Sequence, residues 1–292
     1  MKHLNILNST NSKKLKFFLV VLPFVILSFS CKKETETITP DPTILEYLHI
    51  SHTRKNINPF IDSTTEKILF QKYDMLWLGG DLAQATSIDN PTMSHIDAIF
   101  NIWDPNTLWA VGNHDYSSLQ RVEAYTNRKP YYAYYKNGIT IIVLDTQDSL
   151  SSIVGDQKLF FDNVVDTIQT SSHLVILLHK LIWMHGHPAL EAQITAITNG
   201  GSGPCFHCVN PNNFYTDIYP KLVLLKNKGI NVICISGDIG FNVKEFTFVT
   251  DDHITFLASG INSEDSTNMG LIFYHNLYRN RLSWVFVPTS DL

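Results

Sequence analysis

Residues that can bind a metal or transfer a proton follow four apolar segments of this chain. The motif Gly112-Asn113-His114-Asp115 ends one such segment and places an amide, an imidazole and a carboxylate side by side. These groups can bind a divalent cation, transfer a proton and orient the group that transfers it. Three other apolar segments are followed by Asp81, His179 and Asp238. Because ligands gather at the carboxyl ends of strands in α/β sheets, we expect one shared metal site.

Each of these residues also has a purely structural interpretation. A polar residue directly after a strand is commonly part of a turn or the cap of a following helix. Asp115, for example, could cap a helix that starts near Tyr116 and have no role in chemistry. Four such positions in order along the chain favour the shared site over four separate turns.

The hydrophobic pattern indicates which elements position these residues. Apolar segments of strand length alternate with segments of helical spacing, and no internal repeat is visible. Strands are expected at 44–50, 73–78, 107–111, 131–135, 139–144, 173–178, 232–236, 244–249, 254–258, 271–275 and 282–287. Helices are expected at 57–72, 91–103, 155–168 and 214–228. The alternation predicts a mixed sheet system with covering helices in one domain.

The N-terminal region has the composition of a targeting segment. Three lysines between 13 and 16 precede an uncharged segment from 17 to 29, which is too short for an ordinary membrane span. A secretory signal is therefore expected, with a short anchor helix as the alternative. Cys31 follows small residues, and this resembles a bacterial lipoprotein processing site, which implies cleavage before Cys31 and lipid attachment to it.

The domain organisation and location follow from this pattern. We predict a signal peptide over 1–30, a disordered tether over 31–43 and one domain over 44–292. The protein is then exported and lipid-anchored in the bacterial cell envelope, and it faces either the periplasm or the outside. The formal charge is −5, and no basic patch stands out after the signal, which argues against non-specific nucleic-acid binding.

The remaining cysteines suggest one covalent link. Cys205 and Cys208 could form a disulfide in an oxidising compartment or hold a metal together with His207. The disulfide is favoured, because no second cysteine pair exists to complete a four-ligand zinc site. Cys234 lies in an apolar segment and is expected to be a buried thiol.

The site motifs resemble those of a known family. Gly79-Gly80-Asp81, then Gly112-Asn113-His114-Asp115, then His179 have the order and spacing of the calcineurin-like metallophosphoesterases. The resemblance extends from about residue 44 to the C-terminus. It implies an α/β/β/α sandwich of two mixed β-sheets flanked by helices. It also implies two divalent metals bridged by Asp81, with Asn113 and His179 on the second metal, His114 as general acid and Asp115 orienting His114 through a hydrogen bond.

Two motifs depart from the family pattern. The family has Asp-x-His after its first strand, where this chain has His52-Thr53-Arg54. Near its end the family has Gly-His-x-His, where this chain has Gly237-Asp238-Ile239-Gly240. The resemblance is therefore to a divergent member whose first and last metal-binding motifs are altered.

The departures change the expected number of metals. The second metal keeps Asp81, Asn113 and His179, with Asp238 in place of a histidine, and this set suits Mn²⁺, Fe²⁺ or Zn²⁺. The first metal keeps only Asp81, with His52 as a helper. The fixed charge of Arg54 opposes a dication in the same small space. One metal is favoured over two.

Two functions follow from these alternatives. The first is hydrolysis of a phosphoester: a metal-bound hydroxide attacks phosphorus, Arg54 with His52 stabilises the phosphoryl charge, and His114 protonates the leaving oxygen. The second is a catalytically inactive lipoprotein of the same fold that acts as a surface binding protein. Retention of His114 and Asp115 favours the first.

The segment from 181 to 213 has no regular pattern and is expected to be a functional loop. We expect it to form the wall on the substrate side, with residues Trp183, Phe206, Asn212 and Asn213. His185 and His187 in this loop could supply further metal ligands, although a solvated loop is the favoured interpretation.

Overall fold

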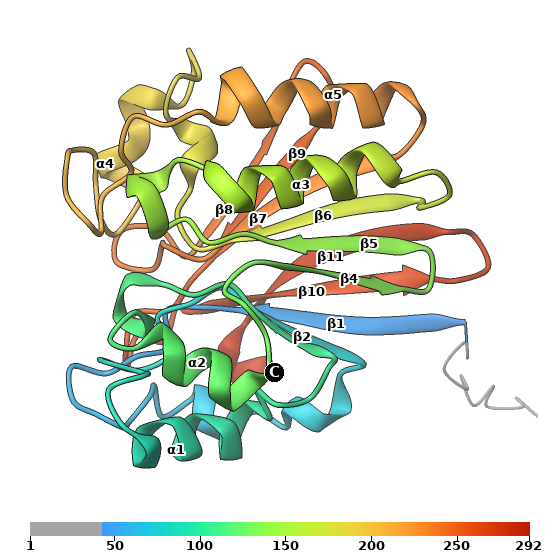
Figure 1. Cartoon of the computed structure of the whole chain (residues 1–292). Coiled ribbons are helices and arrows are strands. Elements are labelled where there is room, and N and C mark those ends of the chain that lie inside the picture. Colours follow the sequence, from blue (N-terminus) through green and yellow to red (C-terminus); the bar gives the residue numbers. More distant parts are fainter. Residues whose placement is uncertain (1–42) are drawn as a thin grey trace, which may run out of the picture. The chain divides into compact units, whose positions relative to one another are not determined.

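Two β-sheets pack face to face in the computed structural model, with helices on both outer faces (Figure 1). The structure describes residues 43 to 292, which lie in one compact unit. The predicted signal peptide, the lipidation site at Cys31 and the tether up to residue 42 lie outside the described residues. No helix in the described part of the chain has the length and apolar character needed to cross a membrane.

The first sheet has five strands, and its centre is parallel. Its order is β11 (Arg281–Pro288), β10 (Met269–Asn276), β1 (Ile44–Ile50), β2 (Met75–Leu78) and β3 (Thr107–Trp109). Strands β1, β2 and β3 run parallel, while β10 is antiparallel to both of its neighbours. The carboxyl ends of β1, β2 and β3 therefore lie at one edge.

The second sheet has six strands with antiparallel strands at both ends. Its order is β4 (Tyr132–Lys136), β5 (Ile139–Val143), β6 (His173–Leu178), β7 (Asn231–Ser236), β9 (Thr255–Ser259) and β8 (Glu245–Val249). Strands β5, β6, β7 and β9 are parallel. The predicted α/β/β/α sandwich of two mixed sheets is confirmed.

The helices divide between the two outer faces (Figure 1). Helices α1 (Asn90–Phe100) and α2 (Leu119–Thr126) cover the first sheet, and α3 (Gly155–Thr167) and α5 (Tyr219–Asn227) cover the second. Helix α4 (Ile194–Ile197) is a single turn in the long loop, and a π-helical segment (Phe214–Ile218) precedes α5. Asp89 caps α1 by accepting from the Thr92 N–H at 2.8 Å, and Asn101 ends the helix in a left-handed conformation.

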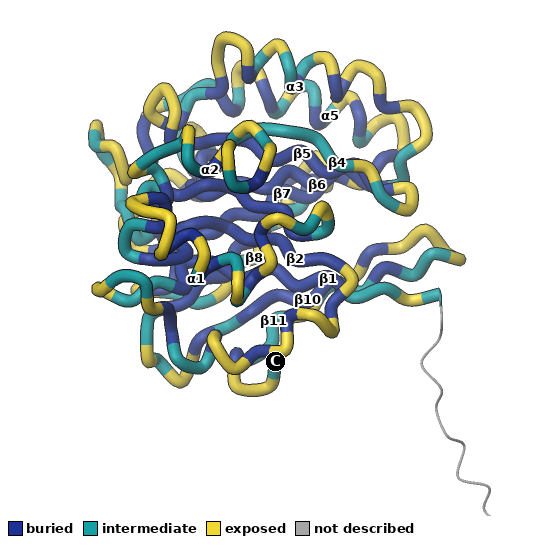
Figure 2. Tube along the Cα trace, turned by 60° about the horizontal axis from the view of Figure 1, so that its bottom comes forward, coloured by how far each residue is buried: buried dark blue, intermediate teal, exposed yellow. Residues whose placement is uncertain are grey.

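Side chains on the two faces of each central strand enter different cores. In β6, Leu174 and Ile176 pack under α3 and α5, whereas Val175 and Leu177 pack between the two sheets. Strands buried on both faces are mostly apolar, which is why the sequence pattern located them well. Figure 2 shows buried residues along the strands and exposed residues on the outer helices and loops.

The segment from 57 to 72 is the clearest error in the sequence-based assignment. It was predicted as mainly helix, yet it contains only two short 3₁₀ turns, Thr65–Lys67 and Phe70–Lys72. The Asp62 carboxylate accepts hydrogen bonds from the backbone N–H groups of Thr64 and Thr65, at 3.0 and 2.9 Å. Such side-chain bonds compete with a continuous helical ladder.

Candidate metal centre

The carboxyl ends of five strands from both sheets meet at one cavity. A cavity of about 300 Å³ is lined by six of the predicted site residues, namely His52, Arg54, Asp81, Asn113, His114 and Asp238. His179 follows β6 and is completely buried beside Asp81 and Asp238. The structure therefore brings together all of the predicted metal ligands.

Glycines allow these strand ends to approach one another. A Cβ atom on Gly112 would lie 2.2 Å from Asp81 Oδ1, and one on Gly80 would lie 2.6 Å from His179 Nδ1. A Cβ atom on Gly237 would lie 2.2 Å from the Gly79 carbonyl oxygen. These glycines are therefore required by the packing of the site itself.

Two of the site residues have a left-handed backbone conformation. Asp81 has φ 55° and His52 has φ 53°, and neither is a glycine. This conformation costs about 1–3 kcal/mol and persists only where neighbouring contacts hold it. Here the His52 N–H donates to the Gly80 carbonyl at 2.8 Å, which ties the two strained segments together. Strain of this kind is concentrated at functional sites.

Hydrogen bonds to backbone carbonyls fix the tautomers of three histidines. The Nδ1–H group of His179 donates to the Gly79 carbonyl, that of His52 to the Ile261 carbonyl, and that of His114 to the Gln84 carbonyl, each at 2.7 Å. Because a carbonyl only accepts, each neutral ring keeps its lone pair on Nε2. This is the arrangement by which proteins orient imidazoles that bind metals.

The atoms around Asp81 Oδ1 fit a divalent cation. His179 Nε2 lies 3.6 Å from Asp81 Oδ1 and 3.9 Å from Asp238 Oδ1. His179 Nε2 and Asp238 Oδ2 are buried and have no hydrogen-bond partner among the described residues. Nitrogen and oxygen ligands about 2.1 Å from a tetrahedral ion lie about 3.4 Å apart, close to the spacing seen here.

The electrostatics of these groups are strongly coupled. Burial raises the pKa of Asp238 to about 7, against the opposing effect of His179. Burial would also raise the pKa of Asp81, but His179, His52 and His114 together hold it below its ordinary value. Burial alone would lower the pKa of His179. The carboxylates of Asp81 and Asp238 have the larger combined effect, so the pKa of His179 lies above its ordinary value. A cation would stabilise both carboxylates in their ionised form.

The other oxygen of Asp81 faces an imidazole and a guanidinium instead. His52 Nε2 lies 3.8 Å and Arg54 Nε 3.9 Å from Asp81 Oδ2. Arg54 is held by hydrogen bonds from Nη1 to Gln84 Oε1 at 2.7 Å and to Asn56 Oδ1 at 3.0 Å. Burial lowers the pKa of His52 to about 4, so the guanidinium carries the positive charge on this side.

Position 240 contributes no ligand. Gly240 has φ 134°, and a Cβ atom there would lie 2.4 Å from the carbonyl oxygen of Ile261. The first-metal set that the family resemblance implies is therefore not assembled by the described residues. The candidate ligand His179 lies on the Oδ1 side of Asp81.

Asp115 supports the backbone of the site and does not orient His114. The hydrogen bond that we expected between them is replaced by the one from His114 Nδ1 to Gln84. The buried Asp115 carboxylate instead accepts from five donors: the N–H groups of Asp81, Leu82 and Gly112, Trp109 Nε1 and the Thr86 hydroxyl. It does not cap α2 either, because the Ser118 side chain accepts from Arg121 N and caps that helix.

Comparisons with known proteins give no assignment by sequence. No protein-family model matches the chain, and no curated protein matches it. Among solved structures, it is similar to NAD nucleotidase from Haemophilus influenzae, with a TM-score of 0.41 and 14% identity. It is also similar to a 5'-nucleotidase precursor from Thermus thermophilus, with a TM-score of 0.39 and 10% identity.

A third similar structure is Vps29 from Entamoeba histolytica in complex with zinc, with a TM-score of 0.33 and 10% identity. Each of the three alignments covers 84% of this chain. They cover 50% of the first structure, 54% of the second and 99% of the third. The chain thus spans about half the length of the two nucleotidases.

The long loop contributes different residues from those expected. Trp183 is completely buried and donates from Nε1 to Ser236 Oγ at 3.0 Å, while Asn212 and Asn213 bond to nearby backbone carbonyls. Phe206 packs edge-on against Tyr116 at 5.5 Å. The loop residues that line the cavity are instead Asn199, Gly200 and His207, together with Phe241 from beyond the loop.

Two further histidines of the loop lie away from the cavity. His185 pairs with Glu191 at 3.4 Å, and His187 packs against Phe248 and Tyr215. Neither of them lines the cavity. Cys205 and Cys208 form a disulfide, and Cys234 is a buried free thiol.

Proposed function

We propose that this protein is a divergent calcineurin-like metallophosphoesterase that hydrolyses a phosphoester with one divalent cation, Mn²⁺, Fe²⁺ or Zn²⁺. The ligands would be Asp81, Asn113, His179 and Asp238. One observation carries the proposal. Two buried candidate ligand atoms, His179 Nε2 and Asp238 Oδ2, have no hydrogen-bond partner among the described residues, and His179 Nε2 lies 3.6 Å from the carboxylate of Asp81, whose backbone is left-handed.

A bound cation would supply Lewis acidity toward a phosphoryl oxygen and activate water as a nucleophile. The residues of the chain contribute the remaining functions. Arg54 is pinned by Gln84 and Asn56, so its guanidinium is preorganised to bind phosphoryl oxygens and stabilise their charge. His52 is neutral and buried, and the lone pair of its Nε2 lies 3.8 Å from Asp81 Oδ2.

His114 is the proposed general acid. Its Nδ1–H group is held by the Gln84 carbonyl, and its backbone N–H donates to Asp81 Oδ1 at 2.9 Å. The ring therefore lines the cavity with Nε2 free to carry the proton that a leaving oxygen receives. Because Gln84 bonds both His114 and Arg54, it couples the acid to the phosphoryl-binding group.

We further propose that the protein is exported and attached to the membrane of the cell envelope through lipid on Cys31. Labelling of cells with a fatty-acid analogue tests this directly. We expect label on the wild-type protein and none on Cys31→Ser, and label on both would contradict the assignment of the anchor.

The catalytic proposal is tested with the purified protein loaded with Mn²⁺, Fe²⁺ or Zn²⁺. We expect about one metal ion per chain by elemental analysis, and turnover of at least one nitrophenyl phosphomonoester or phosphodiester. His114→Ala should lower kcat by about 100-fold or more without loss of metal. The control is His253→Ala, an exposed histidine outside the cavity. No bound metal and no turnover would instead favour the non-catalytic binding protein.

A further inference from the structure

His207 lines the candidate metal centre, although no strand end positions it there. It lines the same cavity as Arg54 and His114. Its side chain is exposed and makes no hydrogen bond or ion pair with any residue in the range 43–292. An imidazole ring always offers at least one N–H donor, so His207 presents an unused donor to this space.

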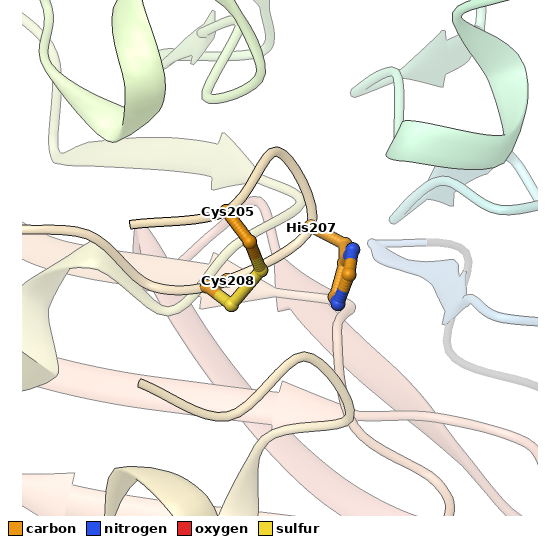
Figure 3. A group of neighbouring side chains, drawn as sticks. All are labelled: Cys205, His207 and Cys208. Atoms are coloured by element: carbon orange, nitrogen blue, oxygen red, sulfur yellow. A yellow bond between two sulfur atoms is a disulfide. The ribbon is translucent and has the colours of Figure 1, made fainter. Parts of the chain in front are cut away.

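The turn that carries His207 is held in place on both sides. The disulfide between Cys205 and Cys208 closes the turn, and His207 projects from it beside the sulfur atoms (Figure 3). Asn210 Nδ2 donates to the carbonyls of both cysteines, at 2.9 Å and 3.0 Å. The position of His207 is therefore fixed by covalent and polar contacts of its immediate neighbours.

Contacts from elsewhere in the fold fix the turn relative to the cavity. The ammonium group of the buried Lys180, next to His179, donates to the Phe206 carbonyl at 2.7 Å. A Cβ atom on Gly200 would lie 1.9 Å from the His207 carbonyl oxygen, so Gly200 allows the turn to pack directly against the cavity wall. Ordered loops of this kind place a side chain without a large entropic cost on binding.

With a divalent cation bound to Asp81, the cavity, which also contains Arg54, would favour an anion. Non-bridging phosphoryl oxygens only accept hydrogen bonds, so they need donors that are not already engaged. We propose that His207 donates a hydrogen bond to a non-bridging oxygen of the bound phosphoryl group, and that the disulfide holds it there. This assignment rests on the proposed phosphoesterase function for the identity of the ligand, but its test does not need turnover.

The test measures binding of inorganic phosphate to the Mn²⁺-loaded protein by titration calorimetry. His207→Ala should weaken binding by about 10-fold, the effect of losing one hydrogen bond to a charged acceptor. His207→Gln should restore part of the affinity, because its amide also donates. His253→Ala is the matched control and should leave the affinity unchanged.

The role of the disulfide is tested by a double-mutant cycle. A variant that carries both Cys205→Ser and Cys208→Ser should bind phosphate more weakly than the wild type, with about the affinity of His207→Ala. It should have no further effect in the His207→Ala background. Circular dichroism verifies folding. If the serine variant does not fold, the wild type is treated with a phosphine, which takes oxygen from water and delivers two electrons and two protons to the S–S bond, leaving two thiols.

The outcomes separate this assignment from the proposed function. Wild-type affinity in His207→Ala, or no phosphate binding by the wild type, would overturn the role of His207. Equal weakening of both backgrounds by loss of the disulfide would overturn the role of the disulfide in holding it. Phosphate binding that depends on His207, without turnover of any phosphoester, would support the anion site and refute the hydrolase.

Discussion

Replacing Asp115 by Asn distinguishes a structural role from a catalytic one. The carboxylate is fully buried and accepts from five donors, so none of them can turn to water. Oδ2 accepts from three of them, and Oδ1 accepts from the Leu82 N–H and the Thr86 hydroxyl. An amide must direct its NH₂ group toward one of these two sets. The NH₂ group is expected to take the Oδ1 side, where it faces two donors instead of three.

The expected cost follows from these contacts. The Thr86 hydroxyl can turn toward the Ala83 carbonyl, 3.5 Å away, but the Leu82 N–H loses its acceptor, which costs about 1–3 kcal/mol. The three bonds that remain lose their charge assistance, at about 1 kcal/mol each. Removing a buried charge beside Asp81 offsets part of this. We expect Asp115→Asn to lower the free energy of unfolding by about 3 kcal/mol.

Urea unfolding followed by circular dichroism in the presence of a chelator measures this cost without the metal. Asp156→Asn is the control, since Asp156 is exposed in the first turn of α3 and should change stability by less than about 0.5 kcal/mol. A variant at position 115 as stable as the wild type would refute the reasoning. If that variant also lost turnover by about 100-fold, Asp115 would regain the role of orienting His114.

Two further predictions concern the packing and titration of the site. Gly112→Ala places a Cβ atom 2.2 Å from Asp81 Oδ1, so the affinity for Mn²⁺ should fall by about 100-fold when it is measured in competition with a chelating dye. The control is Gly270→Ala, whose Cβ atom would meet chiefly the methyl groups of Leu292 and Leu48, and it should leave the Mn²⁺ affinity unchanged. Burial lowers the pKa of His49 to about 3. Below about pH 6.5 the unfolded chain therefore binds a proton at this residue that the folded chain does not. As the pH is lowered from there, the free energy of unfolding decreases by about 1.4 kcal/mol per pH unit. The loss of stability between pH 7 and pH 5 should therefore be about 2 kcal/mol smaller in His49→Gln than in the wild type, and an equal loss in both would contradict this.

Most of the fold could be predicted from local pattern. Strand β6 was predicted with its observed bounds, because all six of its residues are buried and the five after His173 are apolar. The hairpin turn at Asn137 and Gly138 was equally clear, since both residues have positive φ, which these two residue types tolerate. The candidate ligands could be predicted to lie together because parallel strands of both sheets end at one edge.

The remaining features depend on contacts between distant segments. The helix predicted from 57 to 72 is absent because Asp62 and Asn58 bond to backbone groups there and at Ala85. The donors to Asp115 come largely from residues 81 to 86, so its role cannot be inferred from the motif alone. His207 enters the cavity through the course of an irregular loop, for which periodicity gives no signal. The predictions for the N-terminal region remain predictions.

The carbonyl oxygen of Ile261 links two positions of the site. It accepts the hydrogen bond of His52 and also lies 2.4 Å from the position of a Cβ atom at residue 240. A histidine introduced at 240 would therefore collide with backbone, and moving that backbone would release His52. A histidine at 240, as in the two-metal motif, would therefore require the turn at 261 to be rebuilt as well. Positions 52, 240 and 261 are coupled through this one carbonyl group.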